Sequence, residues 1–173
     1  PFSASGSAPS KDVVIETDLM KITFGGKGGS IKQVELKKYK TWDKKPLILF
    51  DESSQHISYK FPLDAATIVN TAEMNFQTNG ENKQLTGNEE VTVSYKLAIS
   101  DNQYLEQFYK IKGNAYTIDY DFNTKGLQNV IPANVKDFQL EWVSKLKNLE
   151  QDVMNERRYS ALYYKENESP ISH

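Results

Sequence analysis

The sequence contains no cysteine and only two histidines, and these shortages exclude several kinds of chemistry. Without cysteine there is no disulfide scaffold, thiolate metal site or cysteine nucleophile. The absence fits the cytosol and the bacterial periplasm equally well. His56 has no second histidine with which to share a metal ion, and His173 is the last residue. We therefore interpret His56 as a solvated side chain in a loop or at a strand edge.

Long hydrophobic runs and an excess of one charge are also missing. The apolar runs are only a handful of residues long, which is too short to cross a bilayer. The chain carries 21 basic and 23 acidic side chains in interleaved order, for a net charge of −2. This balance gives no electrostatic attraction for nucleic acid, so no nucleic-acid partner is expected. A chain of 173 residues is long enough to bury the core of one domain.

The stretch Ile22–Ile31 reads ITFGGKGGSI and raises the question of a phosphate-binding loop. A Walker loop would need Ser or Thr directly after Lys27, and a dinucleotide fingerprint would need glycine where Ile31 stands. Neither pattern is met. Glycine adopts positive φ without steric cost, so the stretch predicts a turn over residues 25–29 between two antiparallel strands.

The middle of the chain predicts an antiparallel meander. Apolar residues alternate with polar ones over residues 91–99 and again over 116–122, and an apolar strand at 104–111 lies between them. Turn residues separate the three segments at 101–102 and 112–114. We expect the first and third of these strands to supply core, with Val93 buried and Thr92 on the outer face.

Shorter patterns also support the prediction of a mostly-β fold. Further strands are predicted at residues 13–15, 19–24, 31–39, 44–51 and 138–142. Leu146, Leu149 and Val153 follow at i, i+3 and i+7, which predicts a short helix near residues 144–156. The fold class expected is an antiparallel β-sandwich with one short helix. Residues 1–11 are interpreted as a flexible linker or expression remnant, 12–165 as the β-sandwich domain and 166–173 as a tail.

No catalytic arrangement emerges from the acids or serines. Asp119 and Asp121 share one strand face, but they alternate with the apolar face, so solvated acids explain them better than a glycosidase pair. No serine has the elbow and base that a nucleophile needs. We therefore predict no catalytic residue, no metal and no cofactor. The candidate contacts with a partner or ligand are aromatic, although core packing uses such side chains more often: Tyr39, Trp42, Tyr104, Phe108 and Tyr109.

Several motifs, taken in order, resemble the large periplasmic domain of the bacterial membrane protein insertase family YidC. The first is the strand Asp18–Phe24, followed by the Gly28–Ile31 turn and by the proline-led apolar run Pro46–Phe50. The segment Tyr104–Phe122 is similar to the family's central hairpin, and Arg157–Tyr164 to a later segment. Each motif is short, but they are collinear from about residue 12 to 165.

This resemblance implies a fold, a place and a role. The fold implied is a β-supersandwich related to the sugar-mutarotase-like fold, placed in the periplasm between a first transmembrane helix and a five-helix membrane core. The insertase chemistry of the family lies in that core, so no catalytic residue or cofactor carries over. The expected function is to assist insertion and folding of inner-membrane proteins, through contacts with Sec translocon components or nascent membrane proteins.

Other interpretations remain open from the sequence. The tyrosines and the related fold also suit a carbohydrate-binding β-sandwich module of a periplasmic or secreted protein. A sugar epimerase is a third and weaker reading, because histidine is so scarce. Domains of this family run further than this sequence. If strands are missing, we expect either self-association through an open strand edge or a helix, built on Leu146, Leu149 and Val153, that covers the open side.

Overall fold

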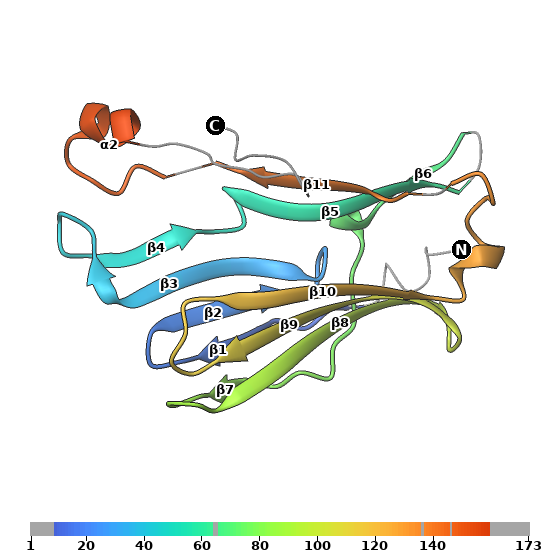
Figure 1. The fold of residues 1–173 in the computed structure, drawn as a ribbon, viewed down its shortest axis with the longest axis horizontal. Helices are drawn as coiled ribbons and strands as arrows, with labels where there is room; N and C mark the ends of the chain where they lie inside the picture. The colour runs from blue at the N-terminus through green and yellow to red at the C-terminus, as the bar shows by residue number, and fades with distance from the viewer. Residues whose placement is uncertain (1–8, 64–65, 136, 146, 160–173) are drawn as a thin grey trace, which may run out of the picture.

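The computed structural model describes residues 9–63, 66–135, 137–145 and 147–159, and it confirms a mostly-β sandwich (Figure 1). One sheet has the order β4-β3-β2-β1-β7, a second β11-β5-β6 and a third β10-β9-β8. The third sheet packs across the first two, because residues from all three sheets form one buried core. The boundary proposed at residue 165 and the tail at 166–173 lie outside the described residues.

The bounds of the elements follow the predicted strands closely. The first sheet contains β1 (Val13–Glu16), β2 (Met20–Gly25), β3 (Ser30–Lys40), β4 (Pro46–Phe50) and β7 (Lys83–Gln84). The second contains β5 (Gln55–Pro62), β6 (Ile68–Asn70) and β11 (Gln139–Ser144), and the third β8 (Glu90–Ser100), β9 (Gln103–Lys112) and β10 (Ile118–Lys125). The remaining elements are the 3₁₀ turns η1 (Thr71–Glu73) and η2 (Leu127–Asn129) and the helix α2 (Val153–Tyr159). The longer strands pair in antiparallel fashion, whereas the short β7 runs parallel to β1.

The predicted meander is present, and β8 supplies core as expected. Val93 is 2% exposed and the side chain of Thr92 is exposed, as the alternation requires. On the neighbouring β9, Leu105, Tyr109 and Ile111 are buried against the same core. The pleat therefore sends one face of each strand inward and the other to solvent.

The third strand of the meander departs from the prediction. Tyr116 precedes β10 and is 45% exposed, and Tyr120 within it is 38% exposed. Only Ile118 and Phe122 are partly buried against the core. The reason is that β10 is the edge strand of its sheet, so part of its inner face looks into open space.

The strand β5 was missed, although its residues alternate. Tyr59 and Phe61 are buried and Ile57 is half-buried, at every second position of β5. His56 therefore lies in the middle strand of the second sheet, and the expectation of a loop or strand-edge position was wrong. Its side chain is nevertheless solvated, and its Nε2 lies 3.8 Å from Glu141.

The helix begins later than the pattern predicted. α2 spans Val153–Tyr159, because the carboxylate of Asp152 accepts a hydrogen bond from the Asn155 N–H and starts the helix there. Leu149 lies upstream of the helix, and Leu146 lies outside the described residues. No residue of α2 is buried, so the idea of a helix that covers the open side was wrong for the described part.

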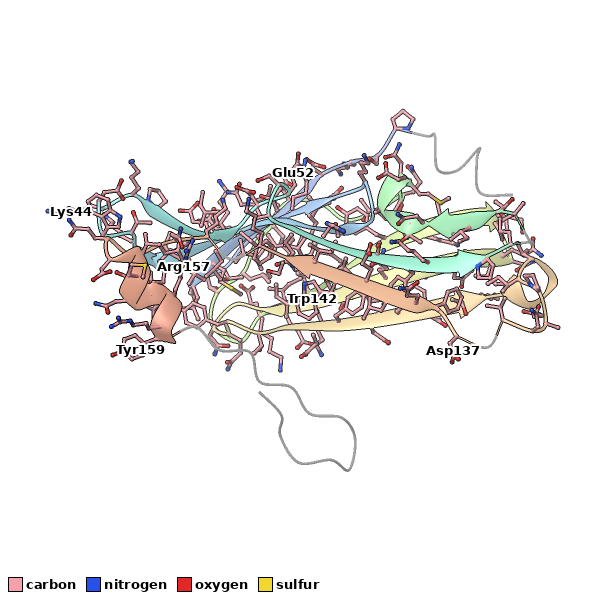
Figure 2. All side chains as sticks on the ribbon, turned by 90° about the horizontal axis from the view of Figure 1, so that it is seen from above. Lys44, Glu52, Asp137, Trp142, Arg157 and Tyr159 are labelled. Atoms are coloured by element: carbon pink, nitrogen blue, oxygen red, sulfur yellow. The ribbon has the colours of Figure 1, made fainter. Side chains whose placement is uncertain are left out.

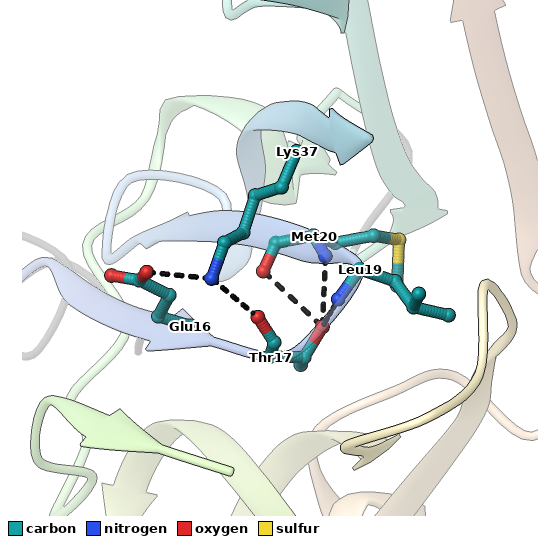
Figure 3. Close-up of polar contacts among 5 residues, drawn as sticks. All are labelled: Glu16, Thr17, Leu19, Met20 and Lys37. Carbon is teal, nitrogen blue, oxygen red and sulfur yellow. Dashed lines mark hydrogen bonds and ion pairs between the residues drawn. The ribbon is translucent and has the colours of Figure 1, made fainter. Parts of the chain in front are cut away.

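Two sets of side-chain hydrogen bonds, made by Thr17 and Lys37, hold the first sheet in register. The Thr17 hydroxyl accepts hydrogen bonds from the N–H groups of Leu19 and Met20, which closes the β1–β2 turn (Figure 3). The Lys37 ammonium on β3 donates to the Thr17 carbonyl and to Glu16, both at 2.8 Å. This hydrogen bond from Lys37 lowers the pKa of the Glu16 carboxyl. Strands β1, β2 and β3 are thereby tied together at one end.

The glycine-rich stretch forms the predicted turn between β2 and β3. Gly28 and Gly29 have φ of 72° and 62°, the left-handed region that favours glycine. Their N–H groups donate to the carbonyls of Met74 and Gly26, at 2.8 and 3.1 Å. These two amides are thus hydrogen-bonded to backbone carbonyls of the same chain, as in a structural turn.

The alternation of β8 generates a paired test. Val93→Asp should lower the free energy of unfolding by about 4 kcal/mol or more, because it buries a carboxylate without a partner. Thr92→Asp introduces the same group on the solvent face and should cost at most about 1 kcal/mol. Urea denaturation measures both, and equal effects would show that the two faces are wrongly assigned.

The glycine turn generates a second test. A Cβ at Gly29 would lie 2.8 Å from both Gln107 Nε2 and Phe76 Cγ, whereas a Cβ at Gly87, also at positive φ, would meet nothing within 4 Å. Gly87→Ala should therefore cost only the backbone strain, about 1 kcal/mol. Gly29→Ala adds overpacking and should cost about 3 kcal/mol in total. Thermal or urea unfolding of the two variants checks the difference, and equal losses would contradict the crowding at Gly29.

Candidate functional site

An apolar groove of about 530 Å³ lies beside β10. Its walls come from β3 and β4, from β5 and β11, and from the start of β10, and single residues of β2 and β9 complete the lining. The residues that line it are Met20, Ile31, Val34, Leu36, Tyr39, Leu49, Phe50, Gln55, Ile57, Tyr109, Tyr116, Ile118, Tyr120, Leu140 and Trp142. Gln55 is the one side chain among them that carries an amide, so the groove is a hydrocarbon and aromatic surface.

The groove exists because three sheet edges meet around it. β4, β10 and β11 are edge strands of their sheets, and each contributes to the walls. The third sheet ends at β10, and the side chains of β4 and β11 that line the groove stay partly exposed. Trp142 on β11, labelled in Figure 2, is 65% exposed in consequence.

Exposed apolar side chains are concentrated at this place. Eleven large apolar side chains in the described part are exposed, and six of them line the groove: Tyr39, Leu49, Tyr116, Tyr120, Leu140 and Trp142. Single exposed apolar residues are normal on a protein surface, but a contiguous patch marks an interaction site. The grouping therefore singles out the groove as the candidate functional site.

The inner wall is fixed by a buried network around Gln107, which is 1% exposed. Its Nε2 donates to the Gly28 carbonyl at 2.9 Å, and its Oε1 accepts from the Tyr120 hydroxyl at 3.0 Å. The Tyr109 hydroxyl donates to the Gly29 carbonyl at 2.8 Å. Tyr120 in turn lies 2.8 Å from the Tyr59 hydroxyl of β5. The network orients the two tyrosine rings that line the groove, Tyr109 and Tyr120.

The hydroxyls of this network are neutral. Burial is the main cause that raises the pKa of Tyr109, and likewise of Tyr120 and Tyr59, above the ordinary value of tyrosine. A neutral hydroxyl both donates and accepts, which the chain from Tyr59 through Tyr120 to Gln107 requires. The inner wall of the groove therefore carries no charge.

The β11 wall is held beside β4 and β5 by its flanking residues. β11 pairs with β5 from Gln139 to Ser144, and the Lys145 N–H donates to the Ser54 carbonyl at 2.6 Å. Beyond it, the Lys147 ammonium is hydrogen-bonded to Asp51 and holds the pKa of that carboxyl below its usual range. Leu140 and Trp142 are thus presented on a strand that is fixed along its length.

The five aromatic residues proposed from the sequence do not form one site. Tyr39 and Tyr109 line the groove, at 52% and 1% exposure. Trp42 lies between β3 and β4 and is 58% exposed. Tyr104 lies 3.8 Å beneath the Lys96 ammonium, and Phe108 is half-buried.

The remaining groove residues were missed, and the sequence held only part of the signal. The alternation of Phe138, Leu140 and Trp142 predicted a strand, but no local pattern shows that this strand is an edge. The same holds for Tyr116 and Tyr120, which were assigned to the core. Which strands end a sheet depends on long-range pairing that alternation does not encode.

A second, polar hollow lies around the glycine turn, and its charges pair with one another. Lys32 contacts Asp12 and Glu52, both at 3.0 Å, and Lys27 contacts Glu73 at 3.3 Å. Within the described ranges, no group of three His, Asp or Glu side chains could hold a metal ion. In the same part of the chain, no helix has the length and hydrophobicity to span a membrane.

The neutral tyrosines generate a spectroscopic test. An unfolded tyrosine ionises near pH 10, whereas folding raises the pKa of Tyr95, Tyr109 and Tyr120 well above that value. Their contribution to stability is therefore complete below pH 10 and is lost as the pH rises beyond it, because the unfolded state releases its protons first. Absorbance at 295 nm should show a gradual tyrosinate rise near pH 10 and a later step that coincides with loss of circular dichroism. A titration of all tyrosines in one gradual wave would contradict the burial.

Comparison with known proteins identifies the family. A family model described as the YidC periplasmic domain matches residues 12–169. The membrane protein insertase YidC of Phocaeicola vulgatus is 29% identical over 164 residues, covering 95% of this chain and 25% of that protein. The proteins of that name from Amoebophilus asiaticus and Chloroherpeton thalassium are each 28% identical, over 94% and 84% of this chain. The chain spans about a quarter of the length of these relatives. With the matched span covering nearly all of the sandwich, this chain belongs to the family of YidC periplasmic domains.

Proposed function

We propose that this domain assists the insertion and folding of inner-membrane proteins by contacting the substrate chain through the apolar groove. The relatives are named membrane protein insertases. Membrane proteins carry long apolar segments, because about 20 apolar residues are needed for a helix to cross a bilayer. The observation that carries the proposal is the groove, with six exposed apolar side chains around a fixed inner wall. The domain acts here by binding, and we expect no enzymatic turnover from it.

The chemistry of the groove suits an apolar polypeptide segment. Its volume of about 530 Å³ lies within the usual range of binding pockets, roughly 300–1,000 Å³. Each Leu, Phe or Val side chain that it removes from water contributes about 1.5–3 kcal/mol before the entropy of binding is subtracted. A few side chains therefore give a weak and reversible contact, which a transient substrate requires.

The adjoining strand edges add a second element of recognition. An extended segment that pairs with the outer edge of β10 would direct alternate side chains into the groove. A sugar ligand, the alternative interpretation, needs many directed polar groups, and Gln55 alone supplies an amide from the lining. Translocon components are the competing protein partners. Such a component would bind the same groove as a folded protein and not as an extended substrate chain.

Peptide binding to the purified domain tests this proposal. An apolar peptide from a membrane protein should quench or shift the emission of Trp142, and Leu140→Ser should weaken binding about tenfold, which is the effect of losing about 1.4 kcal/mol. Val143→Ser is the matched control, because Val143 is 43% exposed on the same strand but does not line the groove. The control should leave binding unchanged.

Several outcomes would contradict the proposal. They are equal loss in the Leu140 and Val143 variants, equal affinity for a scrambled hydrophilic peptide, or binding of sugars in place of peptides. In the full-length insertase, a photo-crosslinker at position 140 should capture the substrate chain, whereas one at position 143 should not. If the crosslinker captured only a translocon subunit, the groove would be a binding site for that subunit and not for the substrate chain.

A further inference from the structure

The hairpin between β3 and β4 concentrates positive charge in a chain that is acidic overall. Residues 37–45 contain five lysines and one acid, whereas the whole chain has a net charge of −2. All five lysines are exposed: Lys37, Lys38, Lys40, Lys44 and Lys45. A local excess of this size creates a positive potential that the net charge does not reveal.

Three of these ammonium groups form no ion pair within the ranges that the structure describes. Lys37 is bound to Glu16 and the Thr17 carbonyl, as Figure 3 shows, and Lys45 lies 2.6 Å from Asp43. Lys38, Lys40 and Lys44 make no ion pair with any residue in the described part of the chain. Their charge is directed to solvent and is free to meet an anionic surface.

The tip of the hairpin presents an indole on a closed turn. The Thr41 N–H donates to the Lys45 carbonyl at 3.0 Å, and the Lys45 N–H donates to the Thr41 hydroxyl at 3.1 Å. Lys44 has φ of 65°, which tightens the turn further. Trp42 is held within this turn and is 58% exposed. An exposed tryptophan beside unpaired lysines is the composition of a membrane-interface anchor.

The helix α2 lies at the same end of the molecule. Figures 1 and 2 both place α2 beside the β3–β4 hairpin, and Figure 2 labels Lys44, Arg157 and Tyr159 there. Arg157 and Arg158 are exposed, and Tyr159 is 87% exposed. Three acids lie in the same segment: Glu150, Asp152, which accepts hydrogen bonds from Asn155, and Glu156, which accepts one from the Leu149 N–H. The hairpin therefore supplies the excess of positive charge at this end, and α2 adds two exposed arginines and an exposed tyrosine beside it.

We propose that this basic end, formed by Lys38, Lys40, Trp42, Lys44, Arg157 and Arg158, docks on a bilayer that contains anionic phospholipid. Trp42 enters the interface between headgroups and acyl chains, and the ammonium and guanidinium groups meet the lipid phosphates. The surface is a protruding tip, which a flat and fluid bilayer accommodates. The proposal rests on the proposed function in one respect, namely that a domain of an inner-membrane insertase works within reach of lipid.

Vesicle binding by the purified chain tests the proposal. The chain should co-sediment with vesicles of phosphatidylglycerol and phosphatidylcholine and not with vesicles of phosphatidylcholine alone, and the binding should weaken as salt rises. Replacing Lys38, Lys40 and Lys44 together by Gln should reduce binding at least tenfold. In a Trp142→Phe background, the remaining Trp42 emission should shift to the blue on vesicle addition, and Trp42→Ala should weaken binding.

A matched triple variant controls for the change in net charge. Lys27 lies in the turn at the other end of β3, and Lys96 and Lys125 both lie by the Tyr104 ring. Their replacement by Gln removes the same charge and should change binding less than twofold. All of these side chains lie on the surface, so the variants should fold, and circular dichroism checks this.

The proposal is overturned if the two triple variants lose binding equally, or if neutral vesicles bind as well as anionic ones. It is also overturned if inorganic phosphate at millimolar concentration displaces the chain, which would mean a site for free phosphate, or if soluble polyglutamate binds as tightly as the vesicles. Failure here is separate from failure of the groove, because Leu140→Ser should bind vesicles normally and the Lys→Gln variant should bind apolar peptide normally.

Discussion

The contact on which the rest of the structure depends is the one between Gln107 and the glycine turn. The carbonyl groups of Gly28 and Gly29 would otherwise be buried without donors, at a cost of about 1–3 kcal/mol each. Gln107 and Tyr109 supply those donors from another sheet, at 2.9 and 2.8 Å. Positive φ at both glycines directs the carbonyls toward that sheet, and the lack of a Cβ at Gly29 leaves space for the amide. The glycine turn, whose sequence raised the question of a phosphate loop, thus binds the side chain of a glutamine of the same chain.

From this contact the polar network extends toward the groove through Tyr120 and reaches Tyr59 on β5. Gln107 and Tyr120 together therefore link all three sheets. On the covered side of the network, aromatic packing such as that of Phe24 on Tyr109, with ring centroids 5.1 Å apart, forms the core. On the open side, the same tyrosines become the inner wall of the groove. The side chains of the network thus contact the core on one side and line the candidate site on the other.

Much of the fold follows from the sequence because its information is local. The alternation of β8, the apolar run of β9 and the glycines before Ser30 each depend on neighbours within a few residues, and each was predicted. The helix start was not, since Leu146, Leu149 and Val153 fit helical spacing but Asp152 sets the first turn. The groove could not be found in this way. Tyr116, Tyr120 and Trp142 have the pattern of core residues, and they are exposed only because the third sheet ends at β10.

The long strand β3 connects the glycine turn with the basic hairpin. It begins at Ser30, directly after the glycine turn, and ends at Lys40, at the base of the basic hairpin. Eleven residues of extended chain span about 35 Å, and pairing with β2 and β4 on either side makes this length stiff. A bilayer that holds the hairpin would therefore fix the height of Gln107 and of the inner wall above the lipid. β3 then acts as a spacer of set length between the membrane surface and the glycine turn to which Gln107 is hydrogen-bonded.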